Sequence, residues 1–125
     1  AARVRTLVPS SFLVGRSVHS VAEVVEAGPV DYLLAGTVWP TPSKPDGHIC
    51  LTPAGLRAVV AATRVPVLAI GGVDLERVPE VRAAGAAGLA AIGAWQPVEC
   101  EGVQGLVRDR SLAFRAAFGA VNMAS

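Results

Sequence analysis

Side chains that can bind phosphate gather in one short segment of the chain. Thr41, Ser43 and Lys44 offer two hydroxyls and an ammonium within four residues. Donors of this kind, above all the charged ones, make the strong hydrogen bonds to phosphate oxygens. Gly71-Gly72 and Ile92-Gly93 add backbone amides that an anion can approach closely, because glycine has no side chain. These residues predict a site for a small phosphorylated molecule.

Ser17 and His19 add a further hydroxyl and an imidazole. Taken alone, each of these features also has a purely structural explanation. Two glycines form tight turns, a single lysine is often a solvated loop charge, and serine or histidine is often a helix cap or a buried polar residue. The prediction of a phosphate site therefore depends on whether the fold brings these hydroxyls, the ammonium and the glycine amides to one place.

Four short apolar runs, at residues 12–15, 30–36, 66–71 and 88–92, predict the strands that position these groups. Segments such as Tyr32-Leu33-Leu34-Ala35 are apolar on both faces, which is typical of buried parallel strands. Helical segments alternate with the runs, and this order predicts an α/β fold with right-handed crossovers. Ligands bind at the carboxyl ends of such strands, where the candidate residues lie.

Start and stop signals mark the helices between the strands. Ser20-Val21-Ala22-Glu23 is a capping box, and Thr52-Pro53 places an N-cap before a proline at the first helical position. Asp74 is suited to cap a third helix, which Gly85 would end. We expect a last helix over residues 103–118.

Composition indicates one globular domain over residues 1–125, since 52% of the residues are apolar and 17% are charged. A net charge of +1 from scattered residues argues against nucleic acid as a partner, and the absence of a long apolar run argues against a membrane. Cys50 and Cys100 form no zinc-binding or disulfide pattern. We therefore expect a cytoplasmic protein without a metal site of its own.

Five motifs follow one another in order: Gly15-Arg16-Ser17-Val18-His19, Val30-Asp31-Tyr32, the segment from Gly36 to Lys44, Ala69-Ile70-Gly71-Gly72 and Ala84-Gly85-Ala86-Ala87-Gly88. In this order and spacing, over about residues 3–95, the chain resembles the thiamine phosphate synthase family and its relative, the thiazole tautomerase. The resemblance implies a (β/α)8 TIM barrel, of which this chain holds about four βα units as a half-barrel or fragment.

The resemblance also implies an activity. The family's enzymes are transferases that join hydroxymethylpyrimidine diphosphate to thiazole phosphate and release pyrophosphate. Ser17 and Lys44 correspond to catalytic residues that contact the pyrimidine diphosphate. The remaining matches correspond to the thiazole phosphate site and are Thr41, Pro42, Ser43, Gly72, Ile92 and Gly93.

Three departures from the family pattern bear on that activity. The family's Mg²⁺ ligands and basic pyrophosphate clamp correspond to strands before Ala1, so Mg²⁺ is implied as a cofactor without ligands in this chain. Gly93 stands where the family usually has serine, which removes a hydroxyl but keeps the amide. Thr37 stands where the tautomerase has a catalytic histidine, which disfavours that activity because threonine cannot shuttle protons near neutral pH.

Three hypotheses remain at this point. The chain is an enzyme of thiamine biosynthesis that needs the other half of its barrel, a non-catalytic phosphate-binding or assembly half-barrel, or an open flavodoxin-like sheet of unrelated function. Four strands covered by helices on one face leave the other face and both edges bare. We therefore also expect either a homo-oligomer or a missing barrel half.

Overall fold

A computed structural model describes residues 2–95 and 103–119. Its centre is a four-stranded parallel sheet made of β1 (Gly15–Val18), β2 (Tyr32–Ala35), β3 (Val67–Ile70) and β4 (Gly88–Ala90). The strands lie side by side in chain order, which places β1 and β4 at the two edges. The expected α/β fold with parallel strands is confirmed.

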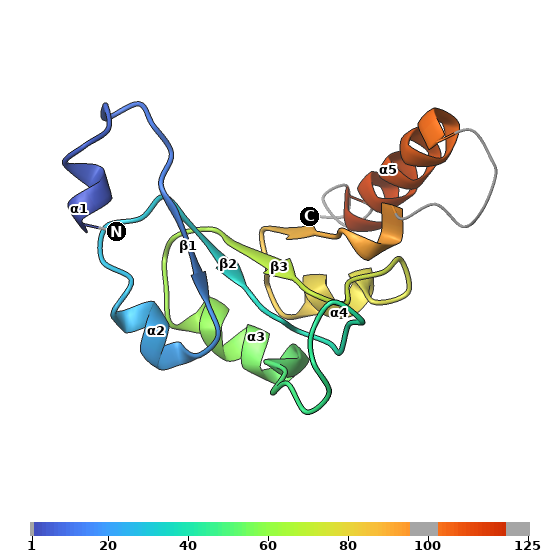
Figure 1. The fold of residues 1–125 in the computed structure, drawn as a ribbon, viewed down its shortest axis with the longest axis horizontal. Coiled ribbons are helices and arrows are strands. Elements are labelled where there is room, and N and C mark those ends of the chain that lie inside the picture. Colours follow the sequence, from blue (N-terminus) through green and yellow to red (C-terminus); the bar gives the residue numbers. More distant parts are fainter. Residues whose placement is uncertain (1, 96–102, 120–125) are drawn as a thin grey trace.

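Helices connect the strands and cover one face of the sheet (Figure 1). α2 (Val21–Val25), α3 (Thr52–Ala61) and α4 (Val78–Ala83) are the crossovers. α1 (Ala2–Arg5) precedes the sheet, and η1 (Gly93–Trp95) and α5 (Val103–Gly119) follow it. α5 lies against α4, where the Arg82 guanidinium donates to the Ala117 carbonyl at 3.1 Å.

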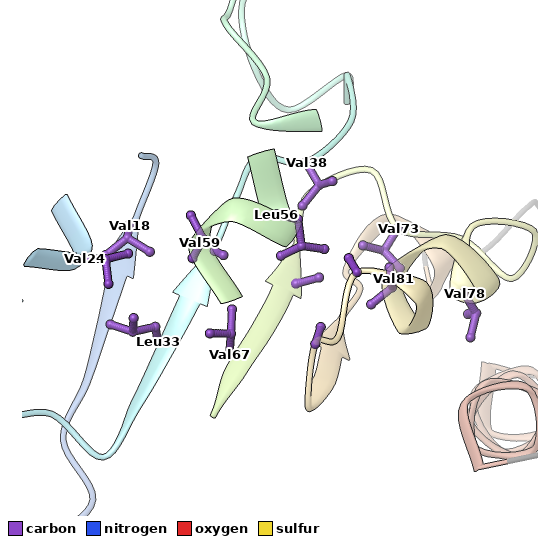
Figure 2. Close-up of a cluster of buried hydrophobic side chains, with 14 of the residues drawn as sticks. Val18, Val24, Leu33, Val38, Leu56, Val59, Val67, Val73, Val78 and Val81 are labelled. Atoms are coloured by element: carbon purple, nitrogen blue, oxygen red, sulfur yellow. The ribbon is translucent and has the colours of Figure 1, made fainter. Parts of the chain in front are cut away.

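The hydrophobic core fills the layer between the sheet and these helices (Figure 2). Burial alternates along the strands, so that Leu33 and Ala35 of β2 are almost fully buried while Tyr32 and Leu34 are only partly covered. Leu56 and Val59 of α3, which lie three residues apart and so on one face of the helix, are fully buried. The strands are thus fully buried on one face only, although segments such as Tyr32–Ala35 are apolar on both.

The opposite face of the sheet is uncovered in the described part of the chain (Figure 1). The register places Ser17, Leu34, Leu68 and Gly88 in one row across all four strands. Alternation puts this row on the face away from the core, and its members are exposed or half-buried. The two central members of the row, Leu34 and Leu68, are apolar, and half-buried leucines on an uncovered face are typical of a surface that another element covers.

The expected strand at residues 12–15 was placed too early, since β1 begins at Gly15. Phe12 and Leu13 are 58% and 70% exposed, so their apolar character does not reflect a buried strand. Pairing with β2 starts only at Gly15, over which the Tyr32 ring lies. The correction matters for the site because Ser17 lies within β1 and not in the loop after it.

The predicted helix signals are largely confirmed. Ser20 Oγ accepts from Glu23 N at 3.3 Å, but the Glu23 carboxylate accepts from His19 N, one residue before the amide expected for a full capping box. Asp74 Oδ1 accepts from Arg77 N at 3.0 Å, in the turn before α4. Gly85, with φ of +85°, follows the end of α4.

At the start of α3, Thr52 Oγ1 accepts from Gly55 N at 3.3 Å, which is the capping bond expected of it. The last helix extends one residue beyond the expected end, to Gly119. No helix of the described segments combines the length and the apolarity needed to cross a bilayer.

Asp31 connects the start of the sheet to the chain before it. Its Oδ2 accepts from Val14 N at 2.7 Å and from Arg5 Nη2 at 2.5 Å, and its own amide donates to Val14 O at 2.8 Å. The Val14 amide, and secondly the Arg5 guanidinium, lower the pKa of this carboxyl below its ordinary value of 3.8. The ionised carboxylate thus anchors α1 to the sheet.

We predict that replacing Gly36 with alanine destabilises the fold, because the new methyl group would overlap the Ile70 carbonyl oxygen and the Ile70 side chain. Overpacking against a fixed backbone atom should lower the free energy of unfolding by about 2–3 kcal/mol. Urea denaturation of Gly36→Ala measures this. Gly119→Ala is the matched control, since a methyl there meets nothing within 4 Å; equal stability of the two variants would contradict the packing described.

We also predict that acid weakens the Asp31 anchor. A carboxyl whose pKa is lower in the folded than in the unfolded state stabilises the fold at pH values above its ordinary pKa of 3.8. This contribution is lost as the pH falls through the lower pKa of the folded state. The fall in unfolding free energy from pH 7 to about pH 3 should therefore be smaller in Asp31→Asn than in the unaltered chain. An identical pH dependence of the two proteins in denaturant titrations would refute this role.

Candidate functional site

The loops that leave β2 and β3 run together beyond the ends of their strands. Val38 N donates to Ile70 O at 3.0 Å, and Trp39 N donates to Gly71 O at 3.1 Å. This pairing continues that of the sheet, so the loop after β2 remains attached to the turn after β3. Both segments lie at the carboxyl ends of adjacent strands, where parallel α/β proteins bind ligands.

Two glycines permit this close approach. Gly71 and Gly72 have φ of +93° and +65°, in the left-handed region that disfavours side chains. A methyl group at Gly71 would lie 2.5 Å from Thr37 Cγ2, and one at Gly72 would lie 2.8 Å from Pro40 O. The two glycines therefore let the turn after β3 pack closely against the loop after β2.

Arg77 braces this junction from the next connection. Its Nη1 donates to Gly72 O at 2.5 Å, and its guanidinium lies 5.3 Å from the centre of the Trp39 ring. A carboxylate oxygen of Asp74 lies 3.6 Å from the same guanidinium nitrogen. Sequence reasoning missed Arg77 because it is separated from Trp39 in the chain and belongs to no recognisable motif. It thereby links the turn after β3 to the loop after β2.

A cavity of about 170 Å³ opens where the loop after β2 folds back on itself. It is smaller than the ~300 Å³ at which pockets for complete small molecules begin. Its size is therefore suited to one phosphate-bearing part of a ligand. Its walls are built by Thr37, Pro40, Thr41, Lys44, Pro45, Asp46, Gly47, His48 and Cys50.

The tip of this loop is a turn in which Lys44 N donates to Thr41 O at 3.1 Å. The hydroxyls of Thr41 and Ser43 lie 3.2 Å apart and form a hydrogen bond. Lys44 is exposed and is the only lysine in the sequence. Its ammonium is therefore available to an anion at the mouth of the cavity.

The structure distributes the predicted site residues over all four strands of the sheet and the loops that follow them. Thr41 and Lys44 line the cavity together. Pro42 and Ser43 lie exposed on the same loop tip, and Gly72 packs against that loop at Trp39 and Pro40. Ile92 and Gly93 lie exposed at the end of β4, and a methyl at Gly93 would meet nothing within 4 Å.

Ser17 lies on the edge strand β1, next to β2, the strand whose loop carries Thr41 and Lys44. It is exposed on β1 and pairs in register with Leu34. His19, at the end of the same strand, is engaged by Glu23, whose carboxylate lies 3.1 Å from His19 Nδ1. Hydrogen bonds from His19 lower the pKa of Glu23.

The cavity also contains Asp46, His48 and Cys50, which sequence reasoning did not select. The motif that predicted a phosphate site ends at Lys44, and no pattern in the residues after it indicates that the loop folds back toward Thr37. It returns because Leu51 N donates to Thr37 O at 2.8 Å. No set of three metal-ligating side chains that could hold an ion occurs in residues 2–95 and 103–119.

The model of the family described as thiamine monophosphate synthase matches residues 1–95. Among its relatives, the thiamine-phosphate synthase of Methanospirillum hungatei is 41% identical over 92 residues, covering 72% of this chain and 45% of the relative. That of Caldivirga maquilingensis is 48% identical over 86 residues, covering 66% and 41% respectively. The chain thus spans about half the length of the curated relatives it matches.

A solved structure of thiamine phosphate pyrophosphorylase from Pyrococcus furiosus superposes with a TM-score of 0.78 at 31% identity. The match covers 97% of this chain and 55% of that one. Sequence and fold therefore agree on the same relatives, and the motifs at the ends of β2 and β3 fall inside the matched region. The chain belongs to the thiamine monophosphate synthase family.

Proposed function

We propose that the carboxyl-end rim of this sheet binds the phosphate groups of the substrates of a thiamine-phosphate synthase reaction. The observation that carries the proposal is the junction of two loops: the loop that bears the only lysine and two hydroxyls is joined at its base, through Trp39 N and Gly71 O, to the turn after β3. Ammonium, hydroxyl and amide donors thereby lie on one edge, as a phosphate ester requires. Membership of the family supplies the reaction.

The reaction joins a pyrimidine diphosphate to a thiazole phosphate. The carbon–oxygen bond to the diphosphate breaks, pyrophosphate leaves with the electron pair, and the thiazole nitrogen forms the new bond to the resulting pyrimidine cation. Lys44 would offset the negative charge that grows on the leaving pyrophosphate. Ser17, on the edge strand β1, would contact the same diphosphate.

The thiazole phosphate would bind at the loop tip and the two turns. Thr41 and Ser43 offer hydroxyls, Pro42 lies between them on the exposed tip, and Gly72 offers its backbone at the adjoining turn. Ile92 and Gly93 would complete this grip with amides at the end of β4. Support for their role is their place at the last strand of the sheet, since barrels build phosphate sites from the loops after their final strands.

The described residues contain no group of three side chains that could hold a metal ion. Mg²⁺ in the proposed reaction would therefore need further ligands, from the substrate phosphates, from water or from other residues. The unpaired thiol of Cys50 is compatible with a reducing, cytoplasmic setting, which we include in the proposal.

The uncovered sheet face favours a second candidate, a half-barrel that binds phosphate and assembles with another half. A closed barrel has eight parallel strands, whereas the sheet formed by residues 2–95 has four, with β1 and β4 at its edges. We propose that the face packs on a second half-barrel, and that in a preparation of this chain alone the second half is another copy. In such a pair, β4 of each copy would lie beside β1 of the other copy.

We predict that Lys44→Ala weakens binding of inorganic pyrophosphate about tenfold or more, since the variant removes the only ammonium side chain at the rim. Isothermal titration calorimetry measures the change. Arg57→Ala is the matched control, because it removes a positive charge from the exposed surface of α3 and should leave binding unchanged. Equal binding by the unaltered chain and Lys44→Ala would contradict the proposed site.

Incubation with both substrates and Mg²⁺ then separates the two candidates. Thiamine phosphate formed by the chain, and lost in Lys44→Ala, supports the enzyme. Binding of thiazole phosphate without turnover supports the binding half-barrel.

We predict that the purified chain forms a dimer by size-exclusion chromatography with light scattering. Leu34→Glu should shift it toward monomer, because the charge would lie in the apolar row of the uncovered face. Val25→Glu, at a position 79% exposed on α2, is the control and should leave the dimer intact. A monodisperse monomer of the unaltered chain would rule out pairing between copies.

A further inference from the structure

Arg77 contacts both of the loops that meet at the carboxyl end of the sheet. Its Nη1 donates to Gly72 O at 2.5 Å, in the turn after β3, and its guanidinium lies 5.3 Å from the centre of the Trp39 ring, in the loop after β2. A guanidinium at this distance is attracted to an aromatic face, and its planar set of donors suits a carbonyl at a fixed position. One side chain thus connects two of the segments that carry the proposed phosphate-binding groups.

The segment that carries Arg77 is itself fixed in the core. Val73, at the start of this connection, is buried, and Val78, the first residue of α4, is fully buried (Figure 2). Asp74 closes the turn between them, since its Oδ1 accepts from Arg77 N at 3.0 Å and its Oδ2 lies 3.6 Å from Arg77 Nη1. The guanidinium therefore extends from an anchored backbone, and a nearby carboxylate offsets part of its positive charge.

Trp39 lies at the boundary between the anchored base of its loop and the exposed tip. Residues 36–38 are buried and Trp39 is half-buried against the hydrophobic core, whereas most of residues 40–47 are exposed. Thr41 and Lys44 follow Trp39 in the chain after two and five residues. A change in the position of Trp39 therefore displaces the part of the loop that carries the hydroxyls and the ammonium.

We propose that Arg77 is a positioning residue of the phosphate site, which holds the base of the loop after β2 so that Lys44 is placed before the ligand arrives. The inference rests on the proposed function and assigns to Arg77 an effect that acts through Trp39. Order that exists before binding lowers the cost of binding. The alternative is direct attraction of the anion by the charge of Arg77, which the Asp74 carboxylate beside it weakens.

Arg77→Lys separates the two explanations, because lysine keeps the positive charge but lacks the planar guanidinium that contacts Gly72 O and Trp39. We expect this variant to bind inorganic pyrophosphate about fivefold more weakly in isothermal titration calorimetry, which corresponds to about 1 kcal/mol. Full affinity in Arg77→Lys together with reduced affinity in Arg77→Gln would assign the effect to charge and overturn the positioning role.

Arg82→Lys is the matched control. Arg82 also donates from Nη1 to a backbone carbonyl, that of Ala117 at 3.1 Å, but it lies in the last turn of α4, whereas Arg77 immediately precedes the helix. The control therefore removes the same kind of bond away from the rim, and pyrophosphate affinity should not change. Thermal unfolding confirms that both variants are folded, and an equal loss of affinity in the two would contradict a role specific to Arg77.

Amide hydrogen exchange locates the effect of Arg77→Lys without any ligand. Trp39 N donates to Gly71 O at 3.1 Å beyond the carboxyl ends of β2 and β3, and Leu33 N donates to Pro66 O at 2.9 Å near their amino ends. We expect the Trp39 amide to exchange about fivefold faster in the variant and the Leu33 amide to keep its rate. Unchanged exchange at Trp39, or equal acceleration at both amides, would contradict a local hold on the loop.

A double substitution shows whether Arg77 acts through the loop that carries Lys44. In the Lys44→Ala background, Arg77→Lys should change pyrophosphate affinity by less than about twofold, because the displaced loop no longer bears the ammonium. A further fivefold loss in that background would show that Arg77 acts independently of Lys44 and would refute the proposal.

The outcomes also separate this inference from the proposed function. Pyrophosphate binding that is lost in Lys44→Ala but unchanged in Arg77→Lys would overturn the role of Arg77 and leave the proposed function standing. Absence of pyrophosphate binding by the unaltered chain, or binding that Lys44→Ala does not change, would overturn both.

Discussion

The structure depends on the close contact between the backbones that leave β2 and β3. That contact requires three positions without side chains, at Gly36, Gly71 and Gly72, because a methyl group at each would overlap a neighbouring strand or loop. Once it forms, the ladder of the sheet continues beyond the strands through Val38 and Trp39. The proposed phosphate site is in this sense an extension of the sheet and not a separate loop structure.

This origin explains how a short chain can prepare an anion site without a large pocket. The sheet fixes the Gly71-Gly72 turn, the turn fixes the base of the loop after β2, and Arg77 holds the two together through Gly72 and Trp39. The charged group, Lys44, then extends from a positioned base. Such preorganisation lowers the cost of binding, because little of the backbone must be ordered when the ligand arrives.

The sequence was sufficient for the fold class, the parallel order of the strands and the last helix, because these follow from apolar periodicity and from glycine and cap signals. It failed at β1, where Phe12 and Leu13 are apolar yet exposed, since composition does not distinguish a strand from the segment leading into it. It placed Thr41 and Lys44 correctly on one loop but missed His48 and Arg77. Their relation to the site arises from how the chain folds back, which local spacing does not encode.

Amide chemical-shift mapping with inorganic pyrophosphate tests the central claim most directly. The account predicts that the largest shifts fall on the loop tip from Thr41 to Lys44 and on Gly72, with small shifts on the amino-terminal ends of the strands, such as Tyr32 and Val67. Shifts confined to the exposed surface of α3, or spread evenly over the arginines, would contradict it and would indicate only nonspecific attraction of an anion to positive charge.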